Sequence, residues 1–210
     1  MAKKNDSIQK QEQTQSKYLT QRILKQFESI KSYFAEYDSF REKIIIQSRD
    51  IVKLSKLIIF SVQSKKYDEL DKLISDIKNS HNEMLKFATA NNFLMDEGSL
   101  NMAEQELAEA LLFKSMAIDH ILLTAEDLNV KYENYVNGLA DLSGELLRFA
   151  IIEATNKEYN IVQELRQFMN DIYYLLLDLN LRSQEFRHKF DSVKYALKRL
   201  DEICYDISKK

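Results

Sequence analysis

Two pairs of acidic residues at helical spacing are the parts of this sequence best suited to chemistry. Glu106 and Glu109 stand three positions apart, about 60° apart on one helix face. That face is otherwise apolar and carries Met102, Ala103, Ala110 and Phe113. A carboxylate on an apolar face needs a cation or a proton nearby, because an isolated buried charge is costly. The pair therefore predicts either a metal site or ion pairs with a Lys or Arg of a neighbouring helix.

The second pair, Asp141 and Glu145, lies in the run YVNGLADLSGELLR. Its members are four positions apart and share one side of a helix, with Arg148 about one turn further on. They could act as metal ligands together with the first pair. They could also form a salt bridge with Arg148 within their own helix, which would need no metal.

Two of the chain's three glycines, Gly138 and Gly144, lie inside this helical run. Each should cost about 1 kcal/mol relative to alanine in a helix interior. Either the close approach of another helix or the access of a ligand to the backbone would compensate this cost, and close approach is the more common cause.

Four carboxylates on two helices would form a site made only of oxygen ligands, which suits Mg²⁺ or Mn²⁺. Zinc normally recruits His or Cys, and a di-iron site in a helical bundle uses Glu-x-x-His motifs. Neither acidic run contains a histidine or a cysteine. We expect the three histidines, His81, His120 and His188, to be surface or packing residues.

A basic ridge is predicted on the segment FREKIIIQSRDIVKLSKLIIF. Arg49, Lys53 and Lys56 lie within about 60° of one another around the helix axis. Such a ridge could follow RNA phosphates, although a run of charges is commonly only a solvated face. The segment holds more apolar residues than one face can accommodate, so we expect it to be buried centrally or at a subunit contact.

The elements that must position these residues are helices. The 210-residue chain has no proline and only three glycines, and residues that favour helices are abundant. We expect a polar, disordered tail over residues 1–16 and one all-α domain of about seven antiparallel helices over residues 17–210. Asp38 and Ser99 are predicted to begin new helices. The predicted helical ranges are 18–38, 39–63, 67–90, 99–124, 130–154, 157–177 and 181–207.

The balance of charge limits how the chain could bind nucleic acid. The formal net charge of −3 gives no overall attraction to phosphates, so any RNA binding must be local. No signal peptide or membrane span is predicted, and the single cysteine, Cys204, fits a reducing compartment. These features favour a cytoplasmic protein without a membrane partner.

Four segments, in this order, resemble the translin superfamily. They are SRDIVKLSKLIIF from Ser48, QELAEALLF from Gln105, YVNGLADLSGELLR from Tyr135 and KFDSVKYALKRLDEICYD from Lys189. The likeness is greater to the catalytic branch, translin-associated factor X and its archaeal homologues, than to translin itself. Translin lacks the aspartate that this chain has as Asp141.

The resemblance implies a Mg²⁺-dependent endoribonuclease that cuts single-stranded RNA with a metal-activated water. It implies Glu106, Glu109, Asp141 and Glu145 as catalytic residues and metal ligands, and it places Lys56 near the scissile phosphate. We expect Arg49, Lys53 and Arg148 to contact the nucleic acid as well. The resemblance also implies a closed, barrel-like homo-oligomer, usually of eight subunits. The alternatives are a non-catalytic oligomer that binds single-stranded RNA or DNA, and a helical scaffold without a ligand.

Overall fold

The computed structural model describes residues 19–209, and the predicted tail over residues 1–16 lies outside them. Every regular element between residues 19 and 209 is helical, which confirms the predicted all-α class. The chain divides into two units between Glu42 and Lys43. In the first unit the described residues belong mainly to the beginning of helix α2. All the candidate site residues belong to the second unit.

Helix α2 spans Gln21–Gln63 without a break. The predicted helix start at Asp38 is therefore wrong. Aspartate can cap a helix, but it costs only about half a kcal/mol inside one, and no Pro or Gly interrupts the chain here. Within the second unit, the buried side chains of α2 recur at three- or four-residue steps: Ile44, Ser48, Ile51, Ser55, Ile58 and Val62.

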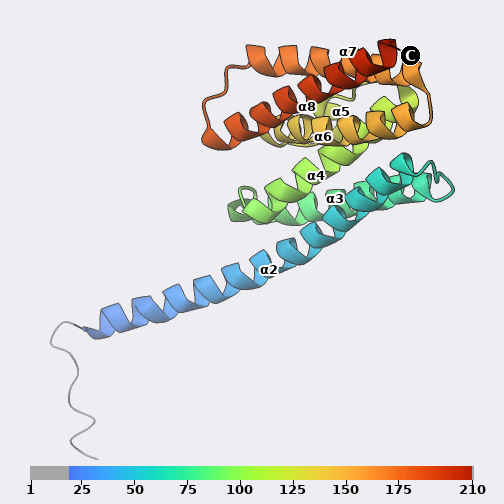
Figure 1. Ribbon diagram of the computed structural model, residues 1–210. Coiled ribbons are helices and arrows are strands. Elements are labelled where there is room, and N and C mark those ends of the chain that lie inside the picture. Colours follow the sequence, from blue (N-terminus) through green and yellow to red (C-terminus); the bar gives the residue numbers. More distant parts are fainter. Residues whose placement is uncertain (1–18, 210) are drawn as a thin grey trace, which may run out of the picture. The chain divides into compact units, whose positions relative to one another are not determined.

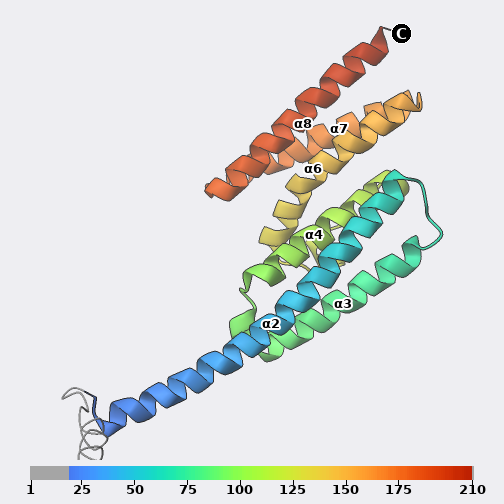
Figure 2. The same cartoon turned by 60° about the horizontal axis from the view of Figure 1, so that its bottom comes forward.

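Not all apolar residues of α2 are buried, contrary to what a central position would require. Ile46, Leu57 and Phe60 are 51%, 40% and 56% exposed. On its buried side the second half of α2 runs beside α3, which spans Leu70–Ala90 (Figures 1 and 2). The ammonium of Lys43 lies 5.4 Å from the centre of the Phe87 ring on α3.

The short 3₁₀ helix η1 (Asn92–Leu94) leads into α4, which spans Gly98–Lys114. The residue at the N-cap of α4 is Glu97, and no side chain caps this end. Ser99, predicted to be the cap, lies inside the helix, and its buried hydroxyl has no hydrogen-bond partner.

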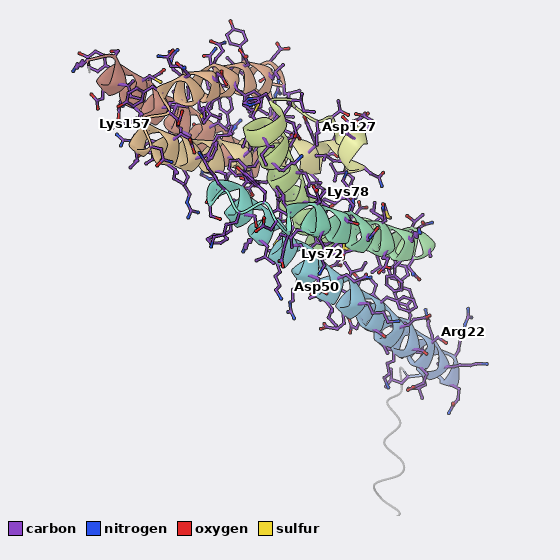
Figure 3. All side chains as sticks on the ribbon, turned by 90° about the vertical axis from the view of Figure 1, so that its right-hand side faces the viewer. Arg22, Asp50, Lys72, Lys78, Asp127 and Lys157 are labelled. Carbon is purple, nitrogen blue, oxygen red and sulfur yellow. The ribbon has the colours of Figure 1, made fainter. Side chains whose placement is uncertain are left out.

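Helix α4 is shorter than the predicted range that ends at residue 124. Its last turn widens into the π-helical η2 (Ser115–Asp119), and His120 then adopts a left-handed conformation with φ of 55°. A new helix, α5 (Ala125–Leu128), begins at Thr124 with a capping box that includes Asp127. Hydrogen bonds from Thr124 lower the pKa of Asp127, and the charge of Lys78 on α3 adds to this effect (Figure 3).

Three long helices complete the fold at nearly the predicted positions: α6 (Tyr132–Thr155), α7 (Tyr159–Asp178) and α8 (Gln184–Ser208). They pack on one another, and α6 also packs on α4 (Figure 1). Apolar side chains of α4 and α6 such as Phe113, Leu142 and Leu146 are completely buried there. No helix in the described range is long and apolar enough to cross a membrane.

Candidate functional site

The two acidic helices, α4 and α6, approach each other closely at Gly138. A Cβ atom at this position would lie 2.8 Å from the Cβ of Ala108, 2.8 Å from the carbonyl oxygen of Gln105 and 3.1 Å from the amide nitrogen of Glu109. Only a residue without a side chain fits so close to another backbone. The close helix approach predicted from the glycines is thus confirmed at Gly138.

Gly144 differs from Gly138. It is exposed on α6, and a Cβ atom there would have no neighbour within 4 Å. The prediction of close helix approach is wrong at this position. Access of a ligand to the backbone at Gly144 remains a prediction.

The crossing brings Asp141 and Glu145 of α6 near enough to Glu109 of α4 to raise its pKa, as does Glu106 on the same helix. We call these four residues the acidic cluster. All four are partly exposed. Burial, and to a smaller extent the negative charges of the other three acids, raise the pKa of Glu109 from its ordinary value of 4.5 to about 8. Glu109 therefore holds a proton at neutral pH unless a cation offsets its neighbours.

A cavity of about 400 Å³ opens beside the acidic cluster, and we call it the acidic cavity. Three of the four acids line it, Asp141 being the exception. Two of the predicted RNA-binding residues, Lys56 and Arg148, line it as well, whereas Arg49 and Lys53 are exposed earlier on α2 and do not. The full lining is Lys56, Ile59, Phe60, Gln63, Glu106, Glu109, Glu145 and Arg148.

Asp141 pairs with a residue that the sequence did not single out as part of the site. Lys189 of α8 donates hydrogen bonds to the Asp141 carboxylate at 2.5 Å and to the side-chain oxygen of Gln105 at 3.1 Å. The predicted salt bridge between Asp141 and Arg148 is not formed. Lys189 lies in a basic stretch of the sequence, but no spacing rule links it to an aspartate 48 residues earlier.

Gln63, at the end of α2, is a second site residue that the sequence did not reveal. Its side-chain amide donates a hydrogen bond to the Glu145 carboxylate. Gln63 is buried, and this contact orients one acid of the cluster. Glu106 and Glu109, by contrast, form no ion pair with any residue of the described range, so the predicted alternative of an interhelical Lys or Arg partner is not seen.

The chemistry of the acidic cluster fits a hard divalent cation. Its donors are all carboxylate oxygens. Burial and the charges of the neighbouring acids raise the pKa of one of them, Glu109, and a bound cation would offset both effects. Within residues 19–209, no three acidic, histidine or cysteine side chains converge closely enough to hold a metal ion already. The cation nearest to Asp141 is the Lys189 ammonium.

None of the three histidines lines the acidic cavity, and His188 is exposed on α8. His120 is exposed, whereas His81 is 2% exposed, and its ring nitrogen lies 3.3 Å from the Glu104 carboxylate. Burial opposes ionisation of Glu104, but hydrogen bonds from His81, Asn134 and the Lys131 backbone outweigh it and lower the Glu104 pKa. This network ties α3, α4 and α6 together. Sequence reasoning missed Glu104, because nothing local distinguishes it from Glu106.

Comparison with known proteins gives a consistent result. Residues 39–209, which include all the candidate site residues, match the model of the Translin family. An uncharacterized protein of Methanocaldococcus jannaschii is 29% identical over 181 residues, which cover 85% of this chain and 76% of that protein. A translin-associated protein X homolog of Schizosaccharomyces pombe is 27% identical over 204 residues, with 86% of each chain covered.

A solved structure of AfC3PO with duplex RNA has a similar fold. The two chains superpose with a TM-score of 0.76 at 22% identity, covering 87% of this chain and 96% of that chain. At this level of identity the similarity concerns the fold.

Proposed function

The chain belongs to the translin family, and from this premise we propose that it is a Mg²⁺-dependent endoribonuclease that cleaves single-stranded RNA. The observation that carries the proposal is the acidic cluster, which consists of four carboxylates on two crossing helices. Three of them raise the pKa of the fourth, Glu109, and the cavity beside them is also lined by the side chains of Lys56 and Arg148. Similarity to a translin-associated protein X homolog and to a structure that binds duplex RNA supports RNA as the substrate.

Glu106, Glu109 and Asp141 would hold the ion, and Glu145 would be a fourth ligand or the base that orients the attacking water. When bound, Mg²⁺ (or Mn²⁺) activates that water and offsets the charge that grows on the phosphate oxygens. Attack by water, and not by the ribose 2′-hydroxyl, leaves 5′-phosphate and 3′-hydroxyl ends.

The neighbouring residues position these acids and the RNA. Gln63 holds the Glu145 carboxylate in place from α2. Lys189 forms an ion pair with Asp141 from α8. Lys56 and Arg148 face the same cavity as the acids and form no ion pair with a described residue, so their charges are available to phosphate oxygens. Arg49 and Lys53 would continue this contact along α2.

Assembly into a closed barrel of identical subunits, eight by the family resemblance, belongs to the same proposal. A barrel would separate the acidic cavities from bulk solution and would bring several of them to one RNA strand. Light scattering coupled to gel filtration measures the number of subunits.

The decisive experiment incubates the purified protein with labelled single-stranded RNA in Mg²⁺ or in EDTA. We expect cleavage in Mg²⁺ only, and at least a hundredfold slower cleavage by Asp141→Ala. Asp50→Ala is the matched control, because Asp50 is an exposed aspartate of α2 outside the acidic cavity (Figure 3). RNA that is retained on a filter without being cut would indicate the non-catalytic binding protein. Undiminished cleavage by Asp141→Ala would refute the assignment of the site.

A further inference from the structure

One residue of the acidic cavity has no role in the chemistry above and does not fit its surroundings. Phe60, on α2, is 56% exposed, although its neighbours Ile58 and Ile59 are buried. No aromatic ring or cation within the described range packs on the Phe60 ring. An apolar ring that opens on a cavity lined by acids loses the benefit of burial unless a ligand covers it.

The position of Phe60 relative to Lys56 indicates what that ligand is. The two residues are four positions apart, so they lie side by side on one face of α2, and both line the acidic cavity. The Cβ atoms of residues four positions apart on a helix lie about 5–6 Å from each other, so a single strand can place a phosphate at Lys56 and a base of the same or the next nucleotide at Phe60. The adjacent Ile59 adds an apolar wall.

From this arrangement we infer that Phe60 is a stacking platform for one unpaired nucleobase next to the phosphate held by Lys56. The inference rests on the proposed function and adds a specificity determinant to it. Stacking contributes affinity that depends little on base identity, because every base has a flat face. Such stacking would supply binding energy to a chain whose net charge of −3 and acidic cavity provide little electrostatic attraction for RNA phosphates.

The platform would also give the protein a preference for single strands. A base in a duplex must leave its partner and its stack before it can lie on Phe60, which costs binding energy. An unpaired base pays little of this cost. Phe60 would therefore favour single-stranded over double-stranded RNA without reading the sequence.

The test measures stacking directly and independently of cleavage. Single-stranded RNAs that carry the fluorescent base 2-aminopurine at successive positions are bound to the Asp141→Asn variant in Mg²⁺, so that the RNA stays intact. We expect strong quenching at one or two adjacent positions. Adding Phe60→Leu should abolish this quenching and weaken RNA binding about tenfold, whereas Phe60→Trp should preserve both.

Ile46→Ala is the control, because Ile46 is an apolar residue of α2 with a similar exposed fraction, 51%, outside the acidic cavity. It should change neither quenching nor affinity. Unchanged quenching in Phe60→Leu would overturn the inference, as would equal quenching on the duplex form of the same RNA. A change of assembly size in Phe60→Leu with intact quenching would overturn it too and would make Phe60 a subunit contact.

The outcomes keep the two proposals apart. If Phe60-dependent quenching is found but wild-type protein does not cut RNA in Mg²⁺, the stacking platform stands and the nuclease proposal fails. If RNA is cut in an Asp141-dependent way without Phe60-dependent quenching, the nuclease stands and the platform fails.

Discussion

Replacing Gly138 by alanine tests whether the close crossing of α4 and α6 builds the site. In an unconstrained helix this change would stabilise the protein by about 1 kcal/mol. Here the new Cβ would lie 2.8 Å from the Gln105 carbonyl oxygen and from the Ala108 Cβ. These atoms belong to the α4 backbone or are attached directly to it, so no side-chain rotation can move them away.

The helices must therefore separate by about 0.5–1 Å to reach ordinary van der Waals distance. Overpacking of this kind costs about 1–3 kcal/mol, which outweighs the gain in helix propensity and leaves a net destabilisation of about 1 kcal/mol. Separation also moves Glu109 away from Asp141 and Glu145. Because a displacement near 1 Å at a catalytic site can cost about a hundredfold in rate, RNA cleavage should fall much more than stability.

Gly144→Ala is the matched control in the same helix, since nothing lies within 4 Å of the added Cβ. It should stabilise the protein by about 0.5–1 kcal/mol. Urea unfolding followed by circular dichroism measures both free energies, and the Mg²⁺ cleavage assay measures the rates. If Gly138→Ala is as stable and as active as Gly144→Ala, the helix crossing does not position the site.

Two further predictions concern the carboxylates of Glu109 and Glu153. Without metal, the free energy of unfolding should fall as the pH rises between about 5 and 8, by up to about 1.4 kcal/mol per pH unit. The reason is that Glu109 has a pKa of about 8 in the folded protein and therefore keeps a proton that the unfolded chain releases near pH 4.5. Urea unfolding in EDTA at several pH values measures this dependence, and Glu109→Gln should make the free energy of unfolding nearly independent of pH in this range. An equal slope in the variant would show that Glu109 is not the titrating group. Lys65→Met should destabilise the protein by about 2–3 kcal/mol, because it removes the ion-pair partner of the fully buried Glu153 on α6. The double change Lys65→Met/Glu153→Met should recover most of this loss in thermal unfolding, and failure to do so would show that the pair is not the cause.

Much of the fold could be predicted because it depends on neighbours along the chain. Apolar residues at three- and four-residue steps predicted α3, α6, α7 and α8 to within a few residues. The errors arose where local signals are ambiguous. Asp38 can cap a helix or continue one, and α2 continues. Nothing in the sequence before Thr124 announces the π turn that ends α4 early.

In the candidate site, too, some features could be predicted from neighbours along the chain and others depended on tertiary packing. The spacing of each acidic pair predicted two carboxylates on one helix face, because an α-helix has 3.6 residues per turn. The glycines predicted a helix crossing, because a residue without a side chain lets another backbone come close. Tertiary packing alone decided that Gly138 and not Gly144 is the crossing point. It also brought Lys189 to Asp141 and left Phe60 uncovered beside Lys56. Those contacts join segments far apart in sequence, and local spacing carries no information about which distant residues meet.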